Sequence, residues 1–322
     1  MRRREFLGVL GAAAAWLPTD ARAQQAVRSR HIGILGSQAL RPIMQFRKKL
    51  QELGYVEGQN LIVETRFAEG RDDRYPALAS DLAALPLDVI IAWGTPAALA
   101  AKRATTKIPI VLVAGDVLNT GIVSNLARPE ANITGFVAVN VELEEKRLEL
   151  LKDIVPHLKR VAVLGNSLNP LNRVNLEIAR RAAAKLSVTI ETFEVQSSRE
   201  VANALAALTV KRPDAALIAS DTLLLSERQR IADALAKSGI PAIYPFREYA
   251  TVGGFIIYGA NISALFENAA GYVDRILKGE KPGDLPVQQA TAFEMIIDLK
   301  AAAKLGLTLS ANVLVRADEV IE

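Results

Sequence analysis

Hydrophobic and polar positions alternate along this chain with two different periods. Short runs rich in β-branched residues are followed by longer stretches in which apolar residues recur every three or four positions. This alternation is typical of α/β proteins built on parallel sheets. In the first half of the chain it predicts strands at residues 31–35, 61–67, 89–93, 108–113 and 133–136, and helices at 39–53, 74–85 and 96–104.

The second half of the chain repeats this scheme. It predicts strands at residues 160–164, 189–195, 215–219, 242–246 and 255–258, and helices at 171–186, 199–211 and 224–237. In the first of these helices Leu171, Val174, Ile178 and Ala182 form one apolar stripe. Two sheets of similar plan explain the repeat more economically than one sheet of ten strands.

Two further helices are predicted to connect the lobes. Residues 142–155 follow the first set of elements and form a crossover helix, and residues 262–277 follow the second set and are expected to cross back. The segment 278–286, rich in Gly, Pro and Lys, is a further expected crossing. We therefore expect one lobe from residues 24–139 plus about 260–283, and another from 140–259 plus about 284–322. Several crossings between two lobes make a hinge that can close around a ligand.

The N-terminus has the pattern of an export signal. Arg2, Arg3 and Arg4 are followed by an apolar stretch at residues 6–17 and by the small-x-small sequence Ala21-Arg22-Ala23. This order predicts a secretory signal peptide over residues 1–23, cleaved near Ala23 into the periplasm. Arg3-Arg4-Glu5-Phe6-Leu7 matches most of a twin-arginine pattern, so the twin-arginine and the general secretory routes both stay open.

Composition narrows the chemistry that the chain can perform. It has no cysteine and two histidines, His31 and His157, both at predicted element boundaries. Thiolate chemistry is excluded, and neither histidine is well placed for a catalytic triad or a zinc site. The formal net charge of +4 includes no dense basic block after the signal segment, so no nucleic acid partner is expected. Dinucleotide, phosphate-loop, HExxH and GxSxG motifs are also missing, so we expect no cofactor, no metal and no catalytic residues.

Candidate binding residues follow from the predicted sheets. Ligands of open parallel sheets bind beyond the carboxyl ends of the strands. The polar and aromatic residues at those positions are Ser37, Gln38, Thr95, Asp116, Asn166, Ser167, Ser220, Asp221, Thr222, Phe246 and Tyr258. Such a set suits reversible recognition of a small polar or amphipathic molecule.

Several of these candidates have a structural alternative. Thr95 follows Gly94 and precedes Pro96, so it can hold a carboxylate at a helix N-terminus or simply cap that helix. Asp116 and Asp221 can each pair with a ligand ammonium or act as a turn residue. An amino-acid ligand needs only one of these two acids. The aromatic residues, together with Trp93, can wall a pocket or belong to the core.

Several separated motifs resemble those of one known family. They include Glu52-Leu53-Gly54-Tyr55-Val56-Glu57-Gly58, Gly94-Thr95-Pro96-Ala97-Ala98, Asn132-Ile133-Thr134-Gly135 and, near the end, Arg316-Ala317-Asp318-Glu319-Val320. With these motifs the chain resembles the ABC transporter substrate-binding proteins related to tryptophan/tyrosine-binding uptake proteins. The resemblance implies a type I periplasmic binding fold, with two Rossmann-like lobes that are each a parallel sheet flanked by helices and are joined by a multi-strand hinge.

The resemblance also implies a function and its partners. It implies an extracytoplasmic protein that captures a small molecule and delivers it to an ABC permease and its ATPase subunit. The resemblance does not settle the ligand, for which we expect an amino acid or a small aromatic carboxylate, and we expect the protein to be a monomer in the periplasm. A periplasmic ligand sensor is one alternative, which neighbouring permease and ATPase genes would disfavour. An exported α/β enzyme using Asp116 or Asp221 as a base is another, which an acid of raised pKa beside a nucleophile would favour.

Overall fold

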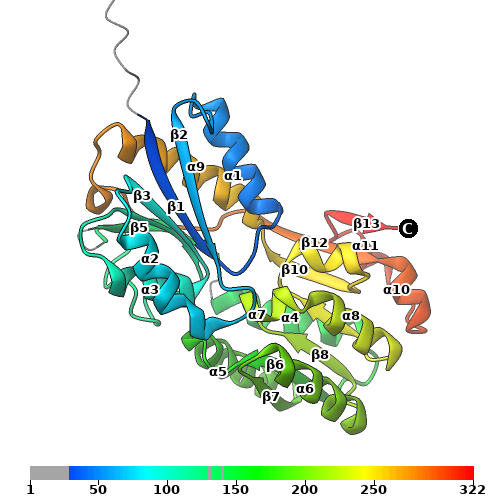
Figure 1. Ribbon diagram of the computed structural model, residues 1–322. Helices are drawn as coiled ribbons and strands as arrows, with labels where there is room; N and C mark the ends of the chain where they lie inside the picture. Colours follow the sequence, from blue (N-terminus) through cyan, green and yellow to red (C-terminus); the bar gives the residue numbers. More distant parts are fainter. Residues whose placement is uncertain (1–28, 130–131, 139–140) are drawn as a thin grey trace, which may run out of the picture.

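The first lobe is built on a six-stranded parallel sheet (Figure 1). The computed structural model describes residues 29–129, 132–138 and 141–322, so the predicted signal peptide lies outside the described residues. The strand order is β11-β5-β4-β3-β1-β2. The strands are β1 (Arg30–Gly36), β2 (Leu61–Phe67), β3 (Val89–Trp93), β4 (Ile110–Ala114), β5 (Ile133–Val137) and β11 (Gln288–Gln289).

The second lobe repeats the same order. Its sheet runs β13-β12-β10-β9-β8-β6-β7, so the fifth, fourth, third, first and second strands of each repeat are neighbours in both sheets. The strands are β6 (Arg160–Asn166), β7 (Thr189–Val195), β8 (Ala215–Ile218), β9 (Ala242–Tyr244), β10 (Ile256–Ala260), β12 (Phe293–Asp298) and β13 (Glu319–Ile321). One departure from the predicted all-parallel sheet is β12, which pairs antiparallel with β10.

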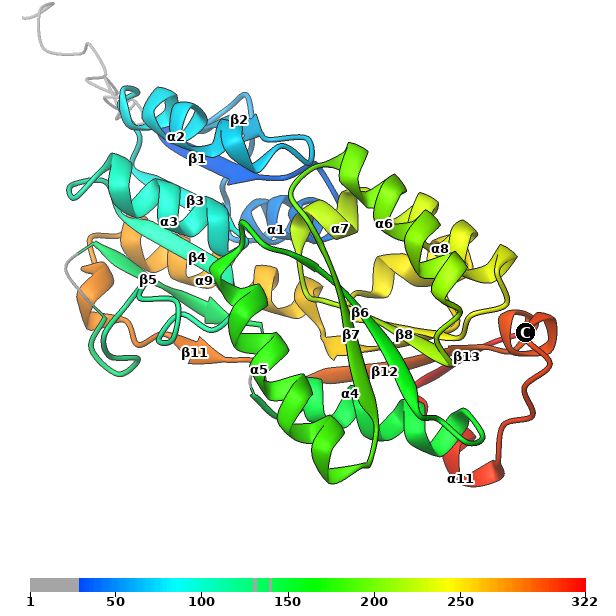
Figure 2. The same cartoon turned by 90° about the horizontal axis from the view of Figure 1, so that it is seen from below.

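Helices cover both faces of the first sheet (Figures 1 and 2). α1 (Arg41–Glu52) and α9 (Ile262–Leu277) pack together on one face, and α2 (Tyr75–Ala83) and α3 (Thr95–Ala104) pack together on the other. The strands alternate between these layers, since Ile91 joins the core under α1 and α9 whereas Ile90 joins the core under α2 and α3. Burial on both faces explains why β3 and β4 are continuous hydrophobic runs.

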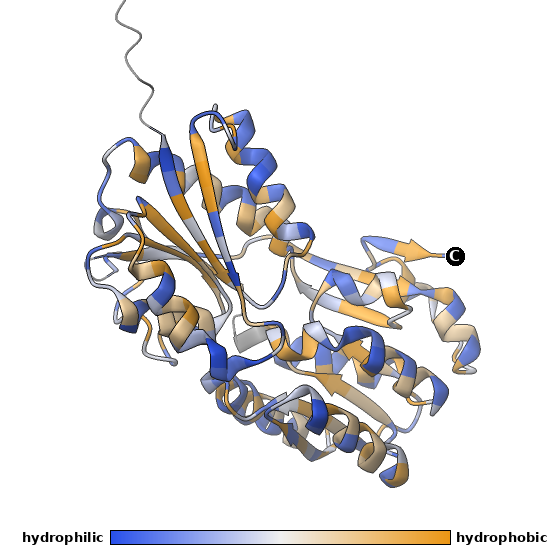
Figure 3. Ribbon diagram, in the orientation of Figure 1, coloured by the Kyte–Doolittle hydropathy of each residue, from blue (hydrophilic) through white to orange (hydrophobic). Residues whose placement is uncertain are grey.

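The second sheet is covered in the same way. α4 (Val141–Ile154) and α5 (Pro170–Lys185) lie on one face, and α6 (Ser198–Lys211) and α8 (Arg228–Lys237) lie on the other. Figure 3 shows blue and orange residues alternating along the helices, as expected for helices with one buried face. The shorter helices are α7 (Thr222–Ser226), α10 (Leu299–Lys304) and α11 (Ala311–Leu314), with 3-10 turns at η1 (Asp72–Arg74), η2 (Arg247–Val252) and η3 (Pro282–Asp284).

The chain passes between the sheets after β5, after β10 and after β11. The last two crossings are hydrogen-bonded to each other, because Asn261 N donates to Ala292 O at 3.0 Å. Ala290 N donates to Val137 O at 2.9 Å, which joins the crossing after β11 to the end of β5. Since β11 pairs with β5, the last change of sheet comes later in the chain than the boundary expected near residue 284. The remaining lobe boundaries stay predictions.

The structure confirms the predicted fold class and differs from the sequence in detail. The helix predicted over residues 224–237 is two helices, α7 and α8, separated at Glu227. Its first part begins earlier than predicted, because the Asp221 side chain caps the backbone of Leu223 and Leu224. Across residues 29–129, 132–138 and 141–322, no helix is both long and apolar enough to span a bilayer.

Candidate functional site

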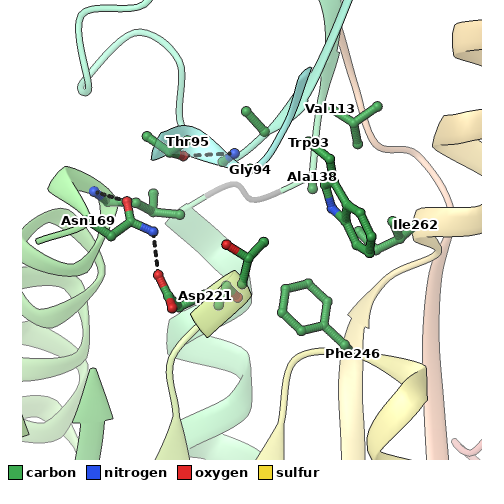
Figure 4. Close-up of a pocket in the computed structure, with 14 residues that line it drawn as sticks. Trp93, Gly94, Thr95, Val113, Ala138, Asn169, Asp221, Phe246 and Ile262 are labelled. Carbon is green, nitrogen blue, oxygen red and sulfur yellow. Dashed lines mark hydrogen bonds between the residues drawn. The ribbon is translucent and has the colours of Figure 1, made fainter. Parts of the chain in front are cut away.

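A narrow cavity lies between the lobes, where the carboxyl ends of strands from both sheets meet. Its volume is about 30 Å³, which is room for one or two water molecules. Figure 4 shows Trp93, Phe246 and Ile262 gathered on one side of the cavity and Asn169 and Asp221 on the other. The lining residues are Trp93, Gly94, Thr95, Val113, Ala114, Gly115, Ala138, Asn169, Leu171, Ser220, Asp221, Thr222, Phe246 and Ile262.

Asp221 is the only ionisable residue among these lining residues. Its Oδ1 accepts hydrogen bonds from the backbone N–H groups of Leu223 and Leu224, at 2.8 and 3.2 Å. Its Oδ2 accepts from the amide groups of Asn169 and Asn166, at 2.7 and 3.2 Å. Burial raises the pKa of Asp221, and these four donors act against that shift. A carboxylate has about four acceptor positions, so those of Asp221 are already occupied within the protein.

Three hydroxyl groups add to the polar side of the cavity. Thr95, in the first turn of α3, accepts a hydrogen bond from Gly115 N at 3.3 Å. Ser220 accepts one from the Arg147 guanidinium at 3.2 Å. The Thr222 hydroxyl is buried without a hydrogen-bond partner. The Thr95 and Ser220 hydroxyls both accept in these bonds, so their protons remain available to a ligand.

The opposite side of the cavity is apolar. The Trp93 indole meets the ring of Phe266 edge to face, with centroids 5.3 Å apart and planes at 80°. This contact fixes the indole at the end of β3. Phe246 follows β9, and Ile262 opens α9 next to the crossing segments. The side chains provide a flat, water-excluding wall suited to an aromatic or apolar ligand group.

A buried ion pair on α4 supports the wall of the cavity at Ser220. Arg147 and Glu144, one helical turn apart on α4, are each 1% exposed, and the Arg147 guanidinium donates to Glu144 Oε1 at 2.6 Å. Arg147 also donates to Tyr258 O of β10 at 2.7 Å. Burial raises the pKa of Glu144 and the arginine opposes that shift. Because Arg147 also donates to Ser220, it connects this residue of the cavity wall to α4 and to β10, the strand that leads into one of the crossings between the lobes.

The two lobes are in contact across the cavity, which makes this a closed arrangement. The Asn166 amide of the second lobe donates to Asp72 Oδ2 of the first lobe at 2.8 Å. A Cβ atom on Gly94 would lie 3.0 Å from Thr222 Cγ2, and one on Gly115 would lie 2.2 Å from Leu171 Cδ2. Glycine at these two positions therefore allows close approach of the lobes.

The structure places some of the predicted candidates at the cavity. Thr95, Ser220, Asp221, Thr222 and Phe246 line it. Asn166 stands behind Asp221 and contacts both lobes. Ser37 and Gln38 lie at the end of β1, and each has a buried polar atom with no hydrogen-bond partner.

The other candidates have different surroundings. Asp116 accepts hydrogen bonds from Leu118 N and Asn119 N, so its carboxylate holds its own loop. Ser167 is exposed and accepts a hydrogen bond from Gln196. The Tyr258 side chain packs against the core between the second sheet and α4, on the sheet face away from Phe246. None of these three side chains is among the lining residues.

Sequence reasoning missed several residues near the site. Asn169 both caps α5 through Leu171 N and holds Asp221, and its position before Pro170 was a recognisable helix start. Asp72 and Tyr75 come from η1 and α2 after β2 and were not among the strand-end candidates. Arg147 carries no sequence signal, because its role depends on the distant residues Ser220 and Tyr258. Within the described residues no cluster of His, Asp or Glu side chains is arranged to hold a metal ion.

Comparison with known proteins gives this geometry a context. A family described as ABC transporter substrate binding protein matches residues 34–321. The chain belongs to this family. As an ABC transporter substrate binding protein it captures a solute outside the cytoplasm for transport, and its partners are a small-molecule ligand and a transporter permease.

Individual relatives support the family assignment. A tyrosine-binding protein from Clostridioides difficile is 26% identical over 281 residues, covering 85% of this chain and 80% of the relative. An ABC domain from Streptococcus pneumonia, solved in complex with L-Trp, is 26% identical with a TM-score of 0.83, covering 91% of this chain and 100% of the other. A ligand-free, open substrate binding protein from Clostridium difficile is 25% identical with a TM-score of 0.62, covering 91% and 99%.

The two solved relatives differ in how closely their structures match that of this chain, although their sequence identities to it are nearly equal. The chain superposes better on the L-Trp complex than on the open, ligand-free protein. This agrees with the cross-lobe contacts of Asn166, Gly94 and Gly115. The lobes of the substrate binding protein are therefore closed in this structure.

Proposed function

We propose that the protein captures an aromatic amino acid or a small aromatic carboxylate between its lobes and delivers it to an ABC permease. The observation that carries this proposal is the two-sided cavity, in which Trp93, Phe246 and Ile262 face a row of hydroxyl and amide groups. An apolar wall facing a few convergent polar groups is the usual arrangement for an amphipathic small molecule. The names of the relatives, which include tyrosine and L-Trp, support an aromatic ligand.

Ligand entry requires the lobes to separate. The closed cavity has room for one or two water molecules, so an aromatic solute enters an open form and the lobes then close around it. We further propose that the protein is exported, cleaved near Ala23 and monomeric in the periplasm, that it binds no nucleic acid, and that it returns its ligand chemically unchanged.

A thermal-shift screen of the purified protein tests the proposal. The panel holds aromatic amino acids, aromatic carboxylates, sugars and short peptides. Aromatic compounds should raise the unfolding midpoint, because a ligand that binds the folded state alone stabilises it by mass action. Chromatography of the mixture afterwards should recover the compound unaltered.

Matched variants connect such a shift to the cavity. Phe246→Leu should reduce the shift, since Phe246 lines the cavity, whereas Tyr258→Phe should leave it unchanged because that ring lies elsewhere. A midpoint raised by sugars alone, or an aromatic compound that is consumed, would overturn the proposal.

A further inference from the structure

Two carboxyl groups from opposite lobes meet at one amide group. The Asn166 side-chain nitrogen donates to Asp72 Oδ2 of the first lobe at 2.8 Å and to Asp221 Oδ2 of its own lobe at 3.2 Å. Asp72 belongs to η1, and Asp221 begins α7. The two acids are therefore neighbours only while the lobes are closed, because opening carries η1 away from Asn166 and α7.

Closure also covers the loop that carries Asp72. A Cβ atom on Gly70 would lie 2.6 Å from Ser226 Oγ and 3.5 Å from Leu223 Cδ1, both on α7 of the second lobe. Burial, followed by the charge of Asp221, raises the pKa of Asp72 to about 6 in this closed arrangement. Both causes involve the second lobe, so in an open form we expect Asp72 to titrate closer to the ordinary pKa of an aspartate, about 4.

The other groups around Asp72 do not neutralise its charge. Asp73 on η1 also raises the pKa of Asp72, and the donor Asn166 lowers it. The Tyr75 phenol on α2 stays neutral, because burial raises its own pKa. Two ion pairs engage the neighbouring arginines, Arg71 with Asp73 and Arg74 with Glu69.

Of the two acids that meet, Asp72 is the one suited to hold a proton. Asp221 already accepts hydrogen bonds from four N–H groups, those of Leu223, Leu224, Asn169 and Asn166. A proton on Asp221 would displace one of these donors, since a protonated carboxyl group is itself a donor. Among the described residues Asp72 accepts one hydrogen bond, from Asn166, so its other oxygen can carry the proton without displacing a donor.

We propose that closing the lobes takes up a proton on Asp72, so that acidic surroundings strengthen ligand capture. Above about pH 7 Asp72 is ionised in both forms, and closing brings its charge into a buried place beside Asp221. As the pH falls through about 6, the closed form binds the proton first and loses that repulsion. Affinity should therefore rise as the pH falls from about 7 to about 4 and level off beyond both ends.

Calorimetric titration with L-tyrosine and L-tryptophan at several pH values tests this inference, which rests on the proposed function because capture there requires closure. We expect the dissociation constant to fall about tenfold between about pH 7.5 and about pH 4.5, as a pKa difference of about two between the forms implies. Titration in two buffers of different ionisation enthalpy should show net proton uptake near about pH 5.5.

Asp72→Asn separates proton uptake from a purely structural contact. This variant keeps an oxygen for the Asn166 amide and is neutral at every pH. At about pH 7.5 it should bind as tightly as the unaltered protein does at about pH 4.5, without the pH dependence and without the proton uptake. A loss of the Asn166 contact alone would instead weaken binding at every pH. Asp73→Asn is the matched control, since Asp73 is an exposed neighbour paired with Arg71, and it should keep the pH dependence.

A second measurement needs no ligand. Small-angle scattering of the ligand-free protein should give a smaller radius of gyration at about pH 4.5 than at about pH 7.5, whereas Asp72→Asn should keep the smaller value at both. Melting of each variant at both pH values checks that it remains folded.

The outcomes separate the two proposals. A pH dependence that Asp72→Asn abolishes in either measurement supports proton uptake. If Asp72→Asn and the unaltered protein respond alike to pH in both, proton uptake is wrong while aromatic capture stands. If neither amino acid binds at any pH, the aromatic function is overturned, and scattering alone decides whether closure takes up the proton.

Discussion

Asp221 shows how one side chain can build a binding cavity without offering itself to the ligand. It begins α7 through two backbone N–H groups and holds Asn169 and Asn166 through their amides. Asn169 in turn caps α5, and Asn166 reaches Asp72 in the other lobe. A single carboxylate thus fixes two helix starts and one cross-lobe contact, because it supplies acceptors only.

Asp221→Asn should therefore destabilise the protein despite its similar shape. One amide oxygen can still cap α7, but the amide nitrogen then faces the donor groups of Asn169 and Asn166. We expect a loss of about 1–3 kcal/mol in the free energy of unfolding, measured by urea denaturation at pH 7. The exposed Asp73→Asn should change little, and an equal loss in both variants would show that Asp221 holds no such network.

At the scale of elements, local patterns predicted most helices and strands but not those set by distant partners. The predicted strand at residues 61–67 and the predicted helix at 262–277 match β2 and α9, since their hydrophobic periods are clear. The break at Glu227 and the short strands β11 and β13 carry no such period. The site followed the same division: strand ends identified Thr95 and Ser220. The contact of Asp72 with Asn166 forms only when the lobes close, so no local pattern marks it.

α4 carries the buried ion pair between Arg147 and Glu144, and Arg147 also bonds the distant residues Ser220 and Tyr258. Arg147→Met should lower the free energy of unfolding by about 3–5 kcal/mol, because it leaves the buried Glu144 carboxylate without its partner. Removing both charges in Glu144→Leu/Arg147→Met should recover much of that loss. Lys146→Met, which breaks the half-exposed pair with Glu149, is the neighbouring control and should cost far less. A double variant less stable than the single one would refute this account of the pair.

For the whole molecule, the central relation is between lobe closure and ligand capture. The core that includes Trp93, Leu171 and Phe246 runs from one lobe into the other through the cavity. Opening exposes part of that apolar surface and separates Asn166 from Asp72. Burial of the apolar surface and the Asn166–Asp72 hydrogen bond therefore both favour the closed form. Residues whose contacts exist only across the gap should change affinity without changing the stability of either lobe.

Gly115→Ala is the sharpest test of that relation. The new methyl group would lie 2.2 Å from Leu171 Cδ2 of the other lobe, so it obstructs closure and leaves the open form unaffected. Overpacking of this kind costs about 1–3 kcal/mol, so we expect ligand affinity in calorimetry to fall about tenfold or more. Small-angle scattering should show a larger radius of gyration with ligand than for the unaltered protein. Gly271→Ala on α9, where an added Cβ has no atom within 4 Å, should bind normally. Truncating the obstructing partner in Gly115→Ala/Leu171→Ala should restore part of the affinity, and if it restores none, the loss does not arise from this contact.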